Sequence, residues 1–220
     1  AWHKQLFDYA NYLGIEILST PFDLSSVDLL ESLGCSAYKI ASFEINHIPL
    51  LQAVASTGKP VILSCGLASK VDISLALDTL ISHKCPSICL LKCTSEYPAP
   101  YDKANLLSMV SMREEFGTYV GVSDHTLDVT VPIVATSLGA SVIEKHITLS
   151  RSDGGIDSSF SLEPDELRQT IESIQRAAST LGKANYYPAT DDSPANMKYR
   201  RSIFISANVA CGELFSSQNI

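Results

Sequence analysis

Short apolar runs that end in polar residues alternate with amphipathic stretches along most of the chain. Six of these runs are rich in Val, Ile and Leu and nearly continuous, a pattern typical of parallel strands that are buried on both faces. We therefore predict six strands. They cover residues 14–23, 37–44, 60–66, 88–95, 119–126 and 141–148.

The stretches around these runs predict helices. The last stretch carries its apolar residues at a period of about 3.6 residues. It begins at Pro164, which suits a first helical turn, and Gly182 follows it as a C-cap. The predicted helices cover residues 2–12, 25–34, 69–84, 104–117 and 164–182.

Strand–helix alternation indicates a parallel sheet, either in an open doubly wound α/β fold or in a (β/α)8 TIM barrel. Polar residues at the C-terminal ends of all six runs favour the barrel, because a barrel gathers successive strand ends around one mouth. An open sheet concentrates function at a single switch point instead. The polar strand-end residues are Ser19, Thr20, Ser42, Glu44, Ser64, Thr94, Ser95, Ser123, Asp124, His125, Glu144 and His146.

The predicted barrel is incomplete, because it needs eight βα units and the sequence shows six. We expect residues 1–182 to form a barrel domain that lacks two N-terminal units. Residues 183–201 are polar, contain two prolines and are expected to form a linker. Residues 202–220 are expected to be the opening strands of a further small domain.

Composition excludes several classes of protein. Of 220 residues, 45% are hydrophobic and 18% are charged, which is enough apolar material for one sizeable core. The net charge of −8 and the lack of a basic segment argue against nucleic-acid binding. No apolar stretch approaches the roughly 18 residues of a membrane span, and we see no signal-peptide pattern. The six cysteines form no C-x-x-C pair, so we expect reduced thiols and a cytoplasmic protein.

Lys39 lies within an apolar strand, where a buried ammonium group needs an anion. Lys39 binds a phosphate or carboxylate ligand, pairs with Glu44, or extends its ammonium group to the barrel rim. Hydroxyl groups at the strand ends would add neutral donors for phosphate oxygens. The loop that contains Gly154, Gly155 and Asp157 follows the last strand and can fold over the mouth.

His125 and His146 end consecutive predicted strands, and neighbouring strands lie about 4.8 Å apart. The two imidazoles are either core residues or ligands of one shared metal ion, and Asp124 could orient one of them. Two nitrogens with the other positions left to oxygen ligands suit Mn²⁺ better than a closed zinc site. Mg²⁺ and Co²⁺ are the alternatives.

Seven segments of the chain together carry a resemblance to a known family. They are STPFD (19–23), YKIASFE (38–44), GKPVILSCG (58–66), LKCTSEYPAPYD (91–102), GVSDHT (121–126), GASVIEKHITL (139–149) and SLEPDEL (161–167). These segments resemble the sialic acid synthase family, and the resemblance covers essentially the whole chain in order. Within that family, the loop GIDSSFSLEP (155–164), the segment ASFE (41–44) and the pair Trp2-His3 resemble the pseudaminic acid synthases.

The resemblance implies a metal-dependent transferase that condenses phosphoenolpyruvate with an N-acetylated amino sugar and releases phosphate by C–O cleavage. His125 and His146 would hold the metal. Asp157, Glu144 and Glu44 would be catalytic, and Tyr97, Glu44 and Asp157 would face the sugar. The residues expected to bind phosphoenolpyruvate are Lys39, Thr20, Ser42, Ser64, Ser95 and Ser123.

The resemblance also sets expectations about assembly and leaves alternatives open. It implies that residues 202–220 begin an antifreeze-like (SAF) domain, that the intact protein is a homodimer, and that a chain limited to these residues is inactive. The expected sugar is 2,4-diacetamido-2,4,6-trideoxy-L-altrose, which would give pseudaminic acid, and the alternative is a mannosamine-type sugar, which would give N-acetylneuraminate or legionaminate. More distant alternatives are an aldolase with Lys39 as Schiff-base amine and a sugar-binding module without catalysis.

Overall fold

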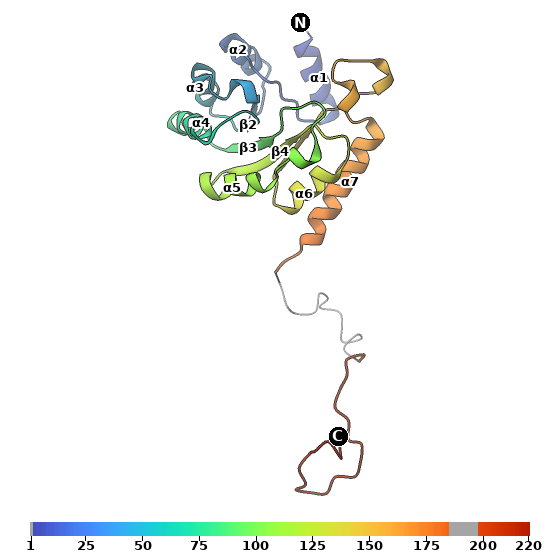
Figure 1. The fold of residues 1–220 in the computed structure, drawn as a ribbon. Helices are drawn as coiled ribbons and strands as arrows, with labels where there is room; N and C mark the ends of the chain where they lie inside the picture. The colour runs from blue at the N-terminus through green and yellow to red at the C-terminus, as the bar shows by residue number, and fades with distance from the viewer. Residues whose placement is uncertain (1, 185–197) are drawn as a thin grey trace. The chain divides into compact units, whose positions relative to one another are not determined.

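The computed structural model describes residues 2–184 and 198–220 (Figure 1). These residues divide into two compact units, Ala1–Leu181 and Gly182–Ile220. The predicted linker, 183–201, falls mostly outside the described residues. No helix in the described ranges is long and apolar enough to cross a membrane.

The first unit is built on one parallel sheet of five strands, which confirms five of the six predicted strands. The strands follow one another across the sheet in chain order, as expected when each is joined to the next by a right-handed helical crossover. They are β1 (Tyr38–Ile40), β2 (Val61–Ser64), β3 (Ile88–Cys93), β4 (Tyr119–Asp124) and β5 (Val142–Lys145).

Within the ranges that the structure describes, seven α-helices accompany these strands, and Figure 1 shows them around the sheet. Four short 3-10 turns, η1 to η4, lie in the loops. The helices are α1 (His3–Leu13), α2 (Leu24–Ser32), α3 (Ile48–Ser56), α4 (Lys70–Ser82), α5 (Leu107–Phe116), α6 (Thr130–Ser137) and α7 (Pro164–Leu181). The turns are η1 (Ser42–Glu44), η2 (Tyr101–Lys103), η3 (Arg151–Asp153) and η4 (Ser158–Phe160).

Helices α3 and α6 are absent from the sequence prediction. Both are short and apolar on nearly all sides, so they lack the polar face that makes a helix visible as a periodic pattern. Each has a proline near its start, at Pro49 and Pro132, where the missing N–H costs nothing. Their burial follows from their composition, since Leu50, Leu51 and Val54 are fully enclosed.

The predicted strand at residues 14–23 is wrong. This segment forms no ladder with β1 or any other described strand, although Ile17 and Leu18 pack against the core. Among the described residues, a single side-chain hydrogen bond links this segment to the residues just before β1. In it, the Ser36 hydroxyl donates to the Glu16 carboxylate at 2.8 Å. An apolar run therefore reached the core here without the backbone pairing that a strand needs.

The core lies between the sheet and its helices. Alternate residues of each strand, such as Tyr38, Leu63 and Leu90, point to this side and are completely buried. The residues between them point to the other face, where the polar strand-end residues gather. The sheet therefore separates a mainly apolar helix side from a side on which most of the polar strand-end residues lie.

Gly121 marks the tightest contact within the sheet. A Cβ atom at this position would lie 2.2 Å from the Val142 carbonyl oxygen and 2.8 Å from Leu91 Cδ2. We expect Gly121→Ala to lower the free energy of unfolding by about 3 kcal/mol, because the backbone of β5 would have to move. Urea denaturation measures the change. Gly155→Ala is the control: its new Cβ would meet only the Ser158 hydroxyl, which can rotate, and a similar loss there would contradict the steric explanation.

The second unit contains no strand or helix among residues 198–220, so the expectation of opening strands is wrong for this segment. One backbone bond, from Ser206 N to Asn219 O at 2.9 Å, joins its two ends. Its apolar side chains, including Phe204 and Leu214, stay exposed. A segment this short buries too little apolar surface to hold a sheet together.

Candidate functional site

A cavity of about 240 Å³ lies at the C-terminal ends of the strands. All but three of the twelve residues predicted for the site line it, and with Cys93 the lining draws on every strand and on the segment before α2. The three that do not line it are Glu44, Ser95 and Asp157. The lining residues are Thr20, Lys39, Ala41, Ser42, Phe43, Ser64, Cys93, Tyr97, Ser123, His125, Glu144 and His146.

Lys39 supplies the positive charge of the cavity. Its Nζ atom donates to Ser64 Oγ at 2.8 Å and to the Ile40 carbonyl oxygen at 3.2 Å, and lies 3.5 Å from Glu144 Oε2. Glu44, one of the partners considered for Lys39, is not beside it, because the carboxylate near Lys39 belongs to Glu144 on β5. Since β1 and β5 are the two edges of the sheet, this contact requires the sheet to curve strongly around the cavity.

Glu144 also links the last two strands. Its Oε1 atom accepts a bond from the Ser123 hydroxyl at 2.6 Å. Glu144, Ser123, Lys39 and Ser64 therefore form one continuous network across the floor of the cavity. Such a network holds a cation and two hydroxyl donors where an anionic ligand would meet them together.

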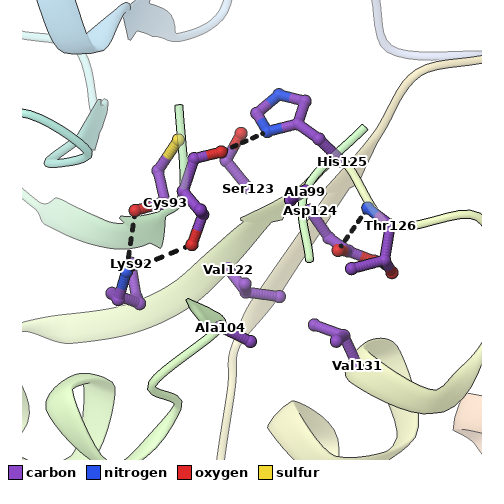
Figure 2. Close-up of a pocket in the computed structure, with 11 residues that line it drawn as sticks. Lys92, Cys93, Ala99, Ala104, Val122, Ser123, Asp124, His125, Thr126 and Val131 are labelled. Atoms are coloured by element: carbon purple, nitrogen blue, oxygen red, sulfur yellow. Dashed lines mark hydrogen bonds between the residues drawn. The ribbon is translucent and has the colours of Figure 1, made fainter. Parts of the chain in front are cut away.

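The two predicted imidazoles face each other in the cavity. The ring centres of His125 and His146 are 5.1 Å apart and their planes meet at 58°. His125 Nδ1 lies 3.0 Å from the Thr94 carbonyl oxygen (Figure 2). A carbonyl oxygen only accepts, so Nδ1 carries the proton and Nε2 keeps a free lone pair.

Both imidazoles are held in the neutral form that binds metals. Burial lowers the pKa of His125 below its ordinary value, and burial together with the nearby His125 ring lowers the pKa of His146. The carboxylate of Asp157 lies 3.7 Å from His146 Nδ1 and opposes this effect only in part. Asp157 thus stands beside the imidazole pair, at the exposed end of the site.

The imidazole pair has the spacing that one shared cation needs. With a metal–nitrogen bond of about 2.1 Å, two imidazoles bound side by side to one ion have their ring centres about 5 Å apart. No group of three or more His, Cys, Asp or Glu side chains within the described ranges is arranged as a metal site. The donor set therefore fits a cation with two protein ligands, whose other positions are open to oxygen ligands.

Two aromatic residues pack against the imidazoles. Tyr97 lies with its ring centre 4.3 Å from that of His125, and Phe160 lies 5.1 Å from His146 and 5.3 Å from Tyr97. Burial raises the pKa of Tyr97, so this phenol stays protonated at neutral pH. Sequence reasoning missed Phe160. Its signal was one large apolar residue in a loop made mostly of Gly, Ser and Asp.

The remaining predicted residues lie at the edge of the cavity or outside its lining. Ser42 Oγ accepts a bond from the Gly66 amide at 3.0 Å, which fixes this hydroxyl at the cavity edge. Ser95 Oγ lies 3.9 Å from Cys93 Sγ, outside the lining. Glu44 Oε2 is enclosed and has no hydrogen-bond partner among the described residues. A buried acceptor without a donor is costly, so Glu44 has capacity to accept one from a ligand.

Asp124 does not orient an imidazole, contrary to the prediction. Its carboxylate points to the helix side of the sheet and accepts bonds from Thr126 and from Lys145. The Thr94 carbonyl takes the orienting role at His125 instead. Alternation explains the difference, because residues 124 and 125 lie on opposite faces at the end of β4.

Comparison with known proteins identifies the family. A model of the NeuB family matches residues 1–186. The pseudaminic acid synthase of Helicobacter pylori is 40% identical over 219 residues, which are 100% of this chain and 64% of that protein. The N,N'-diacetyllegionaminic acid synthase of Campylobacter jejuni is also 40% identical, over 220 residues that cover 99% of this chain and 66% of that protein. The chain thus spans about two thirds of the length of these relatives.

A solved structure supports the same relationship. The crystal structure of an N-acetylneuraminic acid synthetase from Leptospira borgpetersenii, in complex with citrate, superposes with a TM-score of 0.83 at 34% sequence identity. The match covers 90% of this chain and 69% of that one. Sequence and fold lead to the same assignment over most of the chain. This chain belongs to the NeuB family, whose relatives include pseudaminic, legionaminic and sialic acid synthases.

Proposed function

We propose that this chain carries the catalytic cavity of a synthase that joins phosphoenolpyruvate to an N-acetylated amino sugar with the help of a divalent cation. One observation carries the proposal. A lysine with flanking hydroxyl groups and a pair of neutral imidazoles share one cavity. The first group suits an anionic enol phosphate and the second suits a cation that activates a carbonyl oxygen.

In this proposal, different residues bind phosphoenolpyruvate, the cation and the sugar. Lys39, with Ser64 and Ser123 beside it, binds the phosphate and carboxylate oxygens of phosphoenolpyruvate. His125 and His146 hold the cation, with Mn²⁺ as the expected ion, and a cation in that place supplies Lewis acidity toward the sugar aldehyde. Tyr97 lines the cavity and faces the sugar. Glu44 and Asp157 lie outside the lining and are assigned to the sugar as it extends beyond the cavity, where Glu44 offers an acceptor that is unpaired among the described residues.

The reaction in this proposal is the condensation that the family resemblance implies. C3 of phosphoenolpyruvate forms a bond to the aldehyde carbon, water adds at C2, and phosphate leaves with cleavage of its bond to that carbon. One water molecule is consumed and one inorganic phosphate is released. Glu144, which contacts both Lys39 and Ser123, or Asp157, beside His146, handles the proton of the attacking water.

The expected sugar is 2,4-diacetamido-2,4,6-trideoxy-L-altrose. A deoxy sugar presents a methyl group, and the cavity offers Phe43 and Tyr97 as apolar walls. A phosphate-release assay with phosphoenolpyruvate and Mn²⁺ compares this sugar with N-acetylmannosamine in the full-length protein. Faster release with the altrose is expected. Faster release with the mannosamine would assign the alternative product class, and no release with any N-acetylated hexose would overturn the synthase.

The Schiff-base aldolase is disfavoured by the surroundings of Lys39. Hydroxyl groups that suit phosphate oxygens and a pair of imidazoles line the same cavity, and a Schiff-base reaction at Lys39 uses neither of them. Borohydride trapping with pyruvate tests this alternative. We expect no label on Lys39, and a labelled Lys39 would favour the aldolase.

Lys39→Met is expected to raise the KM for phosphoenolpyruvate about 10- to 100-fold, because a charge-assisted bond to an anion is lost. Steady-state phosphate release measures the change. Lys59→Met is the matched control, since Lys59 pairs with Glu31 outside the cavity. An unchanged KM in Lys39→Met would show that the enol phosphate binds elsewhere.

A further inference from the structure

An ion pair is buried behind the two imidazoles, on the helix side of the sheet. Lys145 Nζ lies 2.8 Å from Asp124 Oδ2, and the two side chains are only 5% and 2% exposed. Asp124 is the last residue of β4 and Lys145 is the last residue of β5, and the two are register partners in the ladder. The pair therefore joins the ends of these two strands directly.

The same two side chains also fix the turn that follows β4. Asp124 accepts bonds from the Thr126 amide at 2.9 Å and from the Thr126 hydroxyl at 3.0 Å, and Lys145 donates to the Thr126 carbonyl oxygen at 2.5 Å. Figure 2 shows the Asp124–Thr126 contact beside His125. Residues on both sides of His125 are thus tied to β5.

The position of the pair relates it to the cavity. His125 follows Asp124 and His146 follows Lys145, so each imidazole is attached to a residue of the pair. On the opposite face, Ser123 donates to Glu144 at 2.6 Å. The ends of β4 and β5 are therefore linked on both faces of the sheet, next to the residues that carry the two rings. A shift of either strand would change the distance between the His125 and His146 rings.

Stability alone is a weak explanation for this pair. Removing two charges from water carries a large desolvation cost, and apolar side chains of similar volume often stabilise a fold as well or better. What an ion pair adds over an apolar contact is a fixed distance and direction between two backbone segments. That property matters most where two side chains must meet at one point.

We propose that Asp124 and Lys145 form a positioning pair that sets the separation of the His125 and His146 rings and thereby the affinity of the site for its divalent cation. Neither side chain touches the cavity contents, so both act through the imidazoles. The proposal rests on the proposed function for the identity of the ligand, but the effect on ring separation does not depend on it.

The test uses the full-length double variant Asp124→Asn/Lys145→Met, which removes both charges and leaves no buried charge unpaired. Free Mn²⁺ is titrated by electron paramagnetic resonance, and a crystal structure gives the ring separation. We expect Mn²⁺ affinity to fall about 10- to 100-fold, as when other residues that orient metal ligands are lost, and the separation to depart from 5.1 Å. Glu31→Gln/Lys59→Met, which removes a pair away from the imidazoles, is expected to leave both unchanged.

The outcomes separate this proposal from the proposed function. A folded double variant with unaltered ring separation and unaltered Mn²⁺ affinity would overturn the positioning role. If the unsubstituted protein binds no Mn²⁺, the metal part of the proposed function fails, and the ring separation alone then decides the positioning role. If the double variant does not fold, Lys145→Arg keeps the charge but changes its geometry, and normal affinity with normal ring separation in that variant would overturn the role equally.

Discussion

The His125→Ala variant is expected to release phosphate from phosphoenolpyruvate and sugar about 10³-fold more slowly than the unsubstituted protein at saturating Mn²⁺. Its imidazole is one of two nitrogens available to the cation, and the polarisation of the aldehyde depends on that cation being held in place. Loss of kcat should therefore accompany loss of Mn²⁺ affinity, and chelation of the metal should reproduce the defect in the unsubstituted protein. Phosphate release at several Mn²⁺ concentrations measures both.

His83→Ala is the matched control for this variant. The His83 ring also bonds to a backbone carbonyl, that of Thr79 at 2.9 Å, but it lies at the end of α4, outside the cavity. Its loss should leave the rate within about twofold, in line with a surface substitution away from special features. Equal losses in the two variants, or a His125→Ala variant with normal rate, would contradict the role assigned to the imidazole pair.

The Lys145→Met variant is expected to lose about 3–5 kcal/mol of unfolding free energy, because it leaves the Asp124 carboxylate buried without its cation. Urea denaturation followed by circular dichroism measures the loss. Adding Asp124→Asn should recover most of it, since the unpaired charge is then removed as well. Recovery in the double variant would identify the uncompensated charge, and not the missing lysine stem, as the cause.

Lys103→Met provides the comparison at the surface. Lys103 pairs with Glu96 at 2.7 Å, but both side chains are about half exposed. Water screens such a pair, so its loss should cost at most about 1 kcal/mol. If Lys103→Met and Lys145→Met destabilise the protein equally, burial is not what makes the Asp124–Lys145 pair important.

The sequence pattern predicted all five strands of the sheet and the helices with one polar face. The prediction failed for segments whose hydropathy pattern does not show which other segments they pack against or pair with. The run at residues 14–23 is as apolar as a strand, but its backbone pairs with no described strand. Helices α3 and α6 are too uniformly apolar to show a period. Periodicity is visible only where a polar face contrasts with an apolar one. Helices α3 and α6 each bury one face, but few polar residues mark the other face, and residues 14–23 are mostly exposed or half-buried.

The candidate site was more predictable than the fold around it. Strand-end polarity brought Lys39, Ser64, Ser123 and the two imidazoles together, because the ends of parallel strands meet at one edge. The partners of these residues were not predictable. Whether Lys39 meets Glu44 or Glu144 depends on how far the sheet curves, and the curvature is a property of the assembled strands. Phe160 was missed for a similar reason, since a loop sequence gives no direction for its side chain.

The Lys39–Glu144 contact has a consequence for ligand selection. In the ligand-free protein the ammonium group already has an internal anion, at 3.5 Å, which also holds the Ser123 hydroxyl. An incoming anion must compete with this tethered carboxylate before it gains either donor. Weak monovalent anions such as chloride gain too little to do so, whereas a multiply charged ligand that reaches several donors at once can. We therefore expect small monovalent anions to bind this cavity weakly, even when they are abundant in solution.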